Sequence, residues 1–298
     1  TDAPNMLMIA FRWIKDRSLG GLQSDQQISY LLDTKPLGKL IRKKISFEGV
    51  RARLASGEMH ALSVTAVNYH TGQSVSFFEG HPDLEGWNKL NRVGFRAELT
   101  HQHILASASI PVFFPPVKIG HSFYGDGMVR LNSPLSAAVR LGSERLLLIG
   151  VRGPSSTTQS DEVVHKSVSI SEIAGTILNG LFFDSLDADL ERMQRINRTL
   201  SVMNPEELGK QRDHLRYLPV LSLRPSEEVG DLPACELSRM PSTLRFLLRG
   251  IGLVEGKGTD LLSYLSFEPK YIKSLLELGY EDTMTKKDQV LDFFSMKH

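Results

Sequence analysis

Strand-like and helix-like patterns alternate along this chain, and this alternation restricts its fold more than any other feature. The segment Ala61–Tyr69 is apolar and rich in β-branched residues, a turn follows at residues 70–73, and Ser74–Phe78 alternates as a returning strand does. We expect a helix at Thr100–Ser107 and a buried, parallel strand at Arg145–Val151. The order of elements therefore predicts an α/β fold.

The expected architecture has three layers, α/β/α, with a mainly parallel central sheet and a helical C-terminal extension. The α/β part is expected to occupy residues 1–155. The extension is expected to occupy residues 156–298 and to include one further strand at 217–223. Its clearest signal is an apolar stripe at helical spacing from Ser171 to about Val202. Near the start of the chain, Asp33–Pro36 predicts a turn and the cap of a helix.

Composition excludes several classes of protein. The 35 basic and 34 acidic residues leave a formal net charge of +1, which gives no electrostatic case for a nucleic-acid partner. Cys235 is the single cysteine, so no internal disulfide can form. No uninterrupted apolar run reaches the ~20 residues that a membrane-spanning helix needs. No targeting segment follows Thr1.

The residue with the clearest chemical potential is Asp126, which has Gly125 and Gly127 as its neighbours. Glycines on both sides predict a bend in which the backbone takes positive φ and the carboxylate projects. An Asp-Gly pair is also the commonest hairpin turn, so this pair taken alone indicates only a turn. Its surroundings are more specific: an apolar segment precedes it at Ala106–Val117, and Asn132-Ser133-Pro134 follows it.

Taken together, these segments resemble the patatin-like phospholipases, and the resemblance extends over nearly the entire chain. In that family an apolar segment leads through a hairpin into Tyr-x-Asp-Gly, followed by Asn-x-Pro and a helix. Here the central motif reads Tyr124-Gly125-Asp126-Gly127-Met128, and it departs from the family at Met128, where a small residue is usual. The resemblance implies that residues 1–155 are the C-terminal part of a patatin-like α/β hydrolase domain.

The resemblance also implies a Ser–Asp dyad, in which Asp126 would act as the base and Gly125 and Gly127 would shape its turn. The serine of such a dyad lies on a Gly-x-Ser-x-Gly elbow between a strand and a helix. The chain has no such motif: Gly120–Tyr124 lacks the second glycine and Gly72–Ser76 ends in serine. No glycine-rich oxyanion loop follows a strand either. We expect both elements on a segment that precedes Thr1, in the same polypeptide or as a separate chain.

The expected function is hydrolysis of acyl esters in phospholipids or related lipids, as in a phospholipase A or a lysophospholipase-like esterase, without a cofactor or a metal. The chain by itself is expected to be inactive. The expected location is the cytoplasm, with peripheral attachment to a membrane surface left open. Two alternatives stay open: a non-catalytic lipid-binding or regulatory relative that has lost its serine, and a helical interaction module at residues 171–298.

Three other features have competing interpretations. His101 and His103 form a His-x-His pair, but at a helix start these side chains point to different sides and no acidic or cysteine partner is near. Cys235 has no histidine motif nearby, which favours a structural role. The apolar segment Leu244–Leu253 carries spaced arginines and would either pack on the core or rest on a lipid surface.

Overall fold

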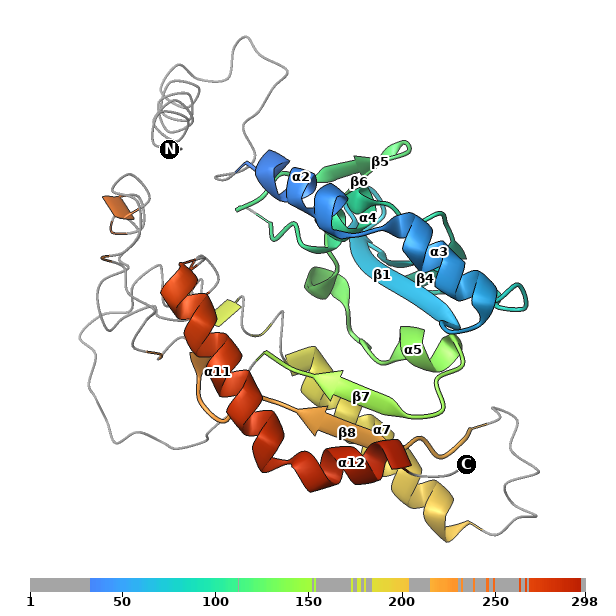
Figure 1. Cartoon of the computed structure of the whole chain (residues 1–298). Helices are drawn as coiled ribbons and strands as arrows, with labels where there is room; N and C mark the ends of the chain where they lie inside the picture. Colours follow the sequence, from blue (N-terminus) through green and yellow to red (C-terminus); the bar gives the residue numbers. More distant parts are fainter. Residues whose placement is uncertain are drawn as a thin grey trace. The chain divides into compact units, whose positions relative to one another are not determined.

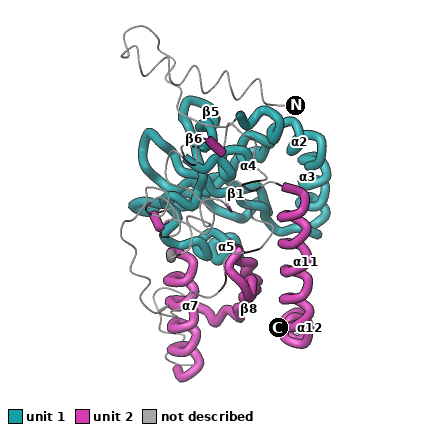
Figure 2. Tube along the Cα trace, turned by 90° about the vertical axis from the view of Figure 1, so that its left-hand side faces the viewer, with its two compact units in different colours: residues 1–142 teal, residues 143–298 magenta. Residues whose placement is uncertain are grey.

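The computed structural model describes residues 33–111, 113–151, 153, 184–203, 215–229 and 268–295, with some single residues between 173 and 266. The chain divides into two compact units, residues 1–142 and 143–298 (Figure 2). This division falls before the strand at 146–149, whereas the sequence analysis placed a boundary after residue 155. The sequence also predicts helices within residues 1–32, a surface loop at 154–160 and a solvated charge at Asp161. These predictions and the one for Cys235 lie outside the described residues. Most of the segment 244–253 does so as well.

The first unit contains one six-stranded sheet with the strand order β3-β4-β2-β1-β6-β5 (Figure 1). The bounds of its strands are β1 Ala61–Asn68, β2 Ser74–Gly80, β3 Trp87–Lys89, β4 Arg92–Arg96, β5 Val117–Ile119 and β6 Ser122–Asp126. Its helices are α2 Lys35–Lys44, α3 Phe47–Ser56, α4 His101–Ser107, the 3₁₀ helix η1 Gly127–Arg130, and α5 Ser136–Arg140. The predicted strands at 61–69 and 74–78 and the helix at 100–107 are confirmed. The helix start predicted at 33–36 corresponds to α2, whose N-cap position is Thr34.

The strand directions differ from the expected, mainly parallel sheet. Only β2 and β4 are parallel, while β1–β2, β1–β6, β3–β4 and β5–β6 are antiparallel. Three of these antiparallel pairs are local hairpins, and a short connection between neighbouring strands forces them to run in opposite directions. The two-residue turn between β5 and β6 has Gly120 at φ 59°. The sheet is therefore mixed, although the α/β class with C-terminal helices is confirmed.

Helices cover both faces of this sheet. On one face a core forms from alternate residues of the strands, such as Ala66 and Phe77, with Ala106 of α4 and Phe47 of α3 packed against them. On the other face the Phe78 ring stacks on Trp87, with 5.6 Å between their centroids, and the Arg140 guanidinium of α5 lies over Trp87. The side-chain period of two along each strand supplies both apolar faces. This packing holds the end of β6 within the protein.

The second unit contains a two-stranded sheet, in which β7 (Leu146–Ile149) pairs in parallel with β8 (Val220–Leu223). Its longer helices are α7 (Asp184–Val202), α11 (Pro269–Thr285) and α12 (Lys287–Ser295) (Figure 1). The predicted strands at 145–151 and 217–223 are confirmed, as is the parallel direction of the first. Its predicted burial is wrong, because only Leu146 is buried and Ile149 is 77% exposed. A strand of a two-stranded sheet has few neighbours to cover it.

Candidate active site

Asp126 is the last residue of β6, a strand with neighbours on both sides, and it lies opposite Ala66 of β1. Its backbone N–H donates to the carbonyl oxygen of Ser109, at 2.9 Å, so the segment after α4 is tied to the same point. The residue is only 8% exposed. The apolar segment, the hairpin and the aspartate that the sequence analysis grouped as one motif therefore meet in space.

Among the residues that the structure describes, one oxygen of the Asp126 carboxylate accepts a hydrogen bond and the other does not. Oδ1 accepts the backbone N–H of Met128 at 2.9 Å and thereby caps the short helix η1. Within the described residues no donor reaches Oδ2. Burial raises the pKa of this carboxyl to about 6, and the hydrogen bond from Met128 opposes that rise. A group that titrates near 6 is ionised at neutral pH and can still accept a proton readily, as a general base must.

Gly125 makes room for an aromatic side chain that the sequence analysis missed. A Cβ at this position would overlap the hydroxyl and ring carbons of Tyr69, so the phenol lies directly across the glycine. The Tyr69 N–H donates to the carbonyl of Phe123 at 2.9 Å, which holds the residue beside β6. Partial burial and then the negative charge of Asp126 raise the pKa of the Tyr69 phenol. Tyr69 was the last residue of the predicted strand at 61–69, and its sequence context gave no signal of this contact.

Gly127 also serves close packing, because a Cβ there would lie 2.5 Å from the carbonyl oxygen of Thr65. The sequence analysis expected positive φ at Gly125 and Gly127. Among the described residues, the glycines with positive φ are instead Gly57, Gly72, Gly120 and Gly142. The two residues that flank Asp126 are therefore required for the approach of β1 to β6 and η1.

Replacing Gly127 with alanine is expected to lower the free energy of unfolding by about 1–3 kcal/mol, since the backbone of β1 must move to admit the methyl group. Denaturant unfolding of the chain, followed by circular dichroism, measures this change. Gly279→Ala is the matched control: no atom lies within 4 Å of that Cβ position in α11, so the variant should be as stable as the parent or more so. Equal stability of the two variants would contradict the packing role of Gly127.

The serines near Asp126 do not complete a dyad. Ser109 is 1% exposed and its hydroxyl donates to the Leu105 carbonyl at 2.6 Å. Ser74 lies at the start of β2 and Ser122 at the start of β6, opposite Val67 and Ile119 respectively. Neither occupies a strand-to-helix turn, where a nucleophilic serine is exposed.

The histidine pair at the start of α4 has a structural role in the described chain. Nδ1 of His103 accepts the backbone N–H of Thr100 at 3.1 Å, and its ring packs edge-on against Phe77 with 4.6 Å between the centroids. Burial lowers the pKa of the His103 imidazole, which keeps it neutral and able to accept that bond. His101 is the first residue of α4, where burial and then the positive charge of Arg42 lower the pKa of its imidazole.

A buried aspartate at the end of a central strand, in an α/β fold, defines a class of site suited to general-base chemistry. The family model of patatin-like phospholipases matches residues 11–139, a range that includes Asp126 and the whole sheet of the first unit. Over these residues the chain is similar to a patatin-like phospholipase domain, which supports the class of lipid acyl hydrolases in general. The match does not extend to the second unit. None of the curated proteins matches the chain significantly.

Proposed function

We propose that this chain supplies the aspartate of a Ser–Asp dyad in a lipid acyl hydrolase, and that the serine comes from polypeptide outside these 298 residues. The observation that carries the proposal is the state of Asp126: it is buried, its pKa is about 6, Met128 holds one oxygen, and among the described residues no donor reaches the other oxygen. That second oxygen is the atom to which a serine hydroxyl would donate its proton.

The reaction would proceed in two steps. Oδ2 of Asp126 takes the serine proton as the serine oxygen attacks the acyl carbonyl, and the proton then passes to the departing alcohol of the lipid. The products of this step are the free alcohol and an acyl-serine. In the second step Asp126 takes a proton from water, the hydroxide displaces the serine oxygen, and the fatty acid is released with the serine restored. The bond from Met128 N–H keeps the carboxylate oriented in both steps.

The proposed substrate is the acyl ester of a phospholipid or a related lipid, reached at a membrane surface by peripheral contact from the cytoplasm. The patatin-like domain supports a lipid substrate in general. None of the described helices combines the length and apolarity needed to cross a membrane. The alternative is a non-catalytic, lipid-binding relative. Such a protein would keep the fold and bind lipid, but the full-length polypeptide would not hydrolyse acyl esters.

The chain by itself is expected to give no stoichiometric labelling with a serine-directed fluorophosphonate probe, because its serines near Asp126 are buried or lie in strands. Intact mass spectrometry after incubation measures this, with an active serine esterase as the positive control for the probe. Labelling mapped to Ser74, Ser109 or Ser122 would show that the nucleophile lies within the chain and would contradict the proposal.

A further inference from the structure

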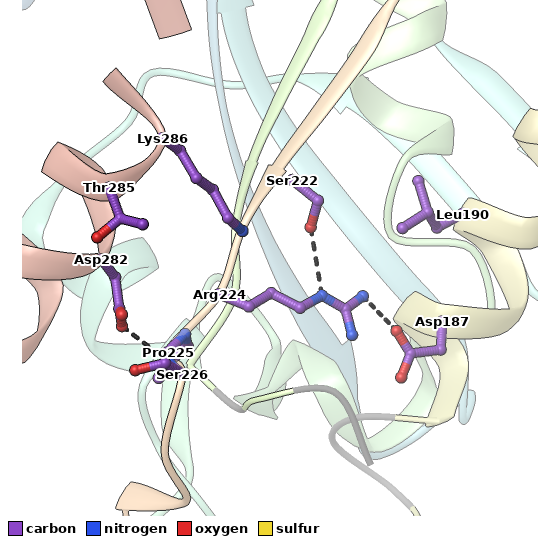
Figure 3. Close-up of a pocket in the computed structure, with 9 residues that line it drawn as sticks. All are labelled: Asp187, Leu190, Ser222, Arg224, Pro225, Ser226, Asp282, Thr285 and Lys286. Atoms are coloured by element: carbon purple, nitrogen blue, oxygen red, sulfur yellow. Dashed lines mark hydrogen bonds and ion pairs between the residues drawn. The ribbon is translucent and has the colours of Figure 1, made fainter. Parts of the chain in front are cut away.

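The second unit contains a cavity of about 430 Å³ that the hydrolase chemistry does not use. It lies where the chain leaves β8, between α7 on one side and the C-terminal end of α11 on the other (Figure 3). Its charged lining consists of Asp187, Arg224, Asp282 and Lys286. The formal charges of these four side chains cancel, so attraction of a ligand depends on which of them already have partners.

Three of these groups are held in place by the protein. The Arg224 guanidinium donates to Asp187 of α7, and its Nε donates to the Ser222 hydroxyl at 3.2 Å. Oδ2 of Asp282 accepts the backbone N–H of Ser226 at 2.8 Å. The arginine side chain is only 17% exposed in its ion pair. Its position is therefore fixed before any ligand arrives.

The remaining donors face the cavity. Figure 3 shows the Lys286 side chain extending from the end of α11 toward Ser222 and Arg224. Within the described part of the chain, Lys286 Nζ makes no ion pair or hydrogen bond, and neither does the second terminal nitrogen of Arg224. Two cationic donors thus converge on one polar cavity, and an oxyanion is the ligand that suits both of them.

We propose that this cavity binds a phosphate group, either free or as a phosphomonoester. Lys286 and Arg224 would contact the charged oxygens, and the free oxygen of Asp282 would accept the proton of a P–OH group. Phosphomonoesters keep that proton for part of the time near neutral pH, because their second pKa is about 6, and inorganic phosphate keeps it to a higher pH. Sulfate is fully deprotonated near neutral pH, so it has no proton to donate to the Asp282 carboxylate and would be repelled by it. The pocket should therefore prefer phosphate to sulfate, and this preference is independent of the proposed hydrolase function.

Isothermal titration calorimetry of the chain with inorganic phosphate tests the site. We expect Lys286→Gln to weaken phosphate binding by about tenfold or more through loss of a charge-assisted bond. Lys287→Gln removes the same charge from the neighbouring exposed residue and should leave binding unchanged. Sulfate should bind at least about tenfold more weakly than phosphate, and Asp282→Asn should narrow that difference. Lys286→Arg, which keeps the charge, should retain binding.

A sedimentation assay distinguishes the source of the phosphate. Vesicles of phosphatidylcholine with phosphatidic acid are compared with vesicles of phosphatidylcholine alone, for the parent chain, Lys286→Gln and Lys287→Gln. Binding of free phosphate that is lost in Lys286→Gln but kept in Lys287→Gln supports a soluble ligand. Binding to vesicles that contain phosphatidic acid, without binding of free phosphate, supports a lipid headgroup if Lys286→Gln also abolishes it. Absence of both kinds of binding, or equal loss in Lys286→Gln and Lys287→Gln, would overturn the site. Equal affinity for phosphate and sulfate would overturn the role of Asp282.

Discussion

Asp126→Asn is expected to lower kcat/KM by about 10²–10⁴-fold in a hydrolase that contains this chain together with its serine segment. Asparagine keeps the shape of the side chain and can still accept the Met128 N–H through Oδ1. It cannot take the serine proton at neutral pH, so the attack on the acyl carbonyl loses its general base. Hydrolysis of a short-chain chromogenic ester measures the loss.

The fold should survive this change. The folded-state pKa of Asp126, about 6, lies above its ordinary value of 3.8. The carboxyl therefore favours folding most below about pH 4, and that contribution is lost as the pH rises through 6. A neutral amide avoids burying the charge, so the thermal midpoint at pH 7 should not fall. Asp83→Asn, at an exposed carboxylate, is the matched control and should keep full activity. Activity of Asp126→Asn within a few-fold of the parent would rule out the assignment.

The second large effect is a pH dependence set by the same group. With the pKa at about 6, Asp126 is protonated at lower pH and cannot act as a base. The kcat/KM of the parent should therefore fall about tenfold for each pH unit below 6, reaching about a hundredfold loss at pH 4. Above pH 7 Asp126 is ionised, and kcat/KM should no longer change with pH through this group. The measurement is kcat/KM of a neutral ester across this range, with stability monitored at each pH.

A midpoint near 4 would contradict this expectation, because it would mean that the aspartate is solvated in the active protein. The histidines beside the sheet are not expected to produce the limb. A limb set by a histidine would persist in Asp126→Asn, whereas a limb set by Asp126 would disappear. His103 has Nδ1 engaged by Thr100.

The local parts of the fold could be predicted from sequence because their signals are local. The hairpin at β5–β6 follows from a tight turn at Gly120, and β1 follows from its β-branched, apolar run. Strand directions across the sheet could not be predicted in the same way. They depend on the order β4-β2-β1-β6, which joins segments far apart in the chain.

The candidate site, like the fold, could be predicted from sequence only in part. Asp126 was predicted as the catalytic residue from its motif, and Gly125 and Gly127 as the residues that shape its turn. Their physical role was predicted wrongly, since they admit Tyr69 and the Thr65 carbonyl and do not take positive φ. The raised pKa of Asp126 arises from burial by several elements, which no sequence window contains. The role of Gly125 and Gly127 thus became visible only when the neighbouring strand was in place.

The central claim is that the carboxylate of Asp126 is the base of a Ser–Asp dyad. Its most direct test is the pH profile of kcat/KM for the parent and for Asp126→Asn, measured side by side on the hydrolase with its serine segment. The account predicts a limb with a midpoint near pH 6 in the parent and a low, flat profile without that limb in the variant. A variant that keeps both the rate and the limb would show that another group is the base.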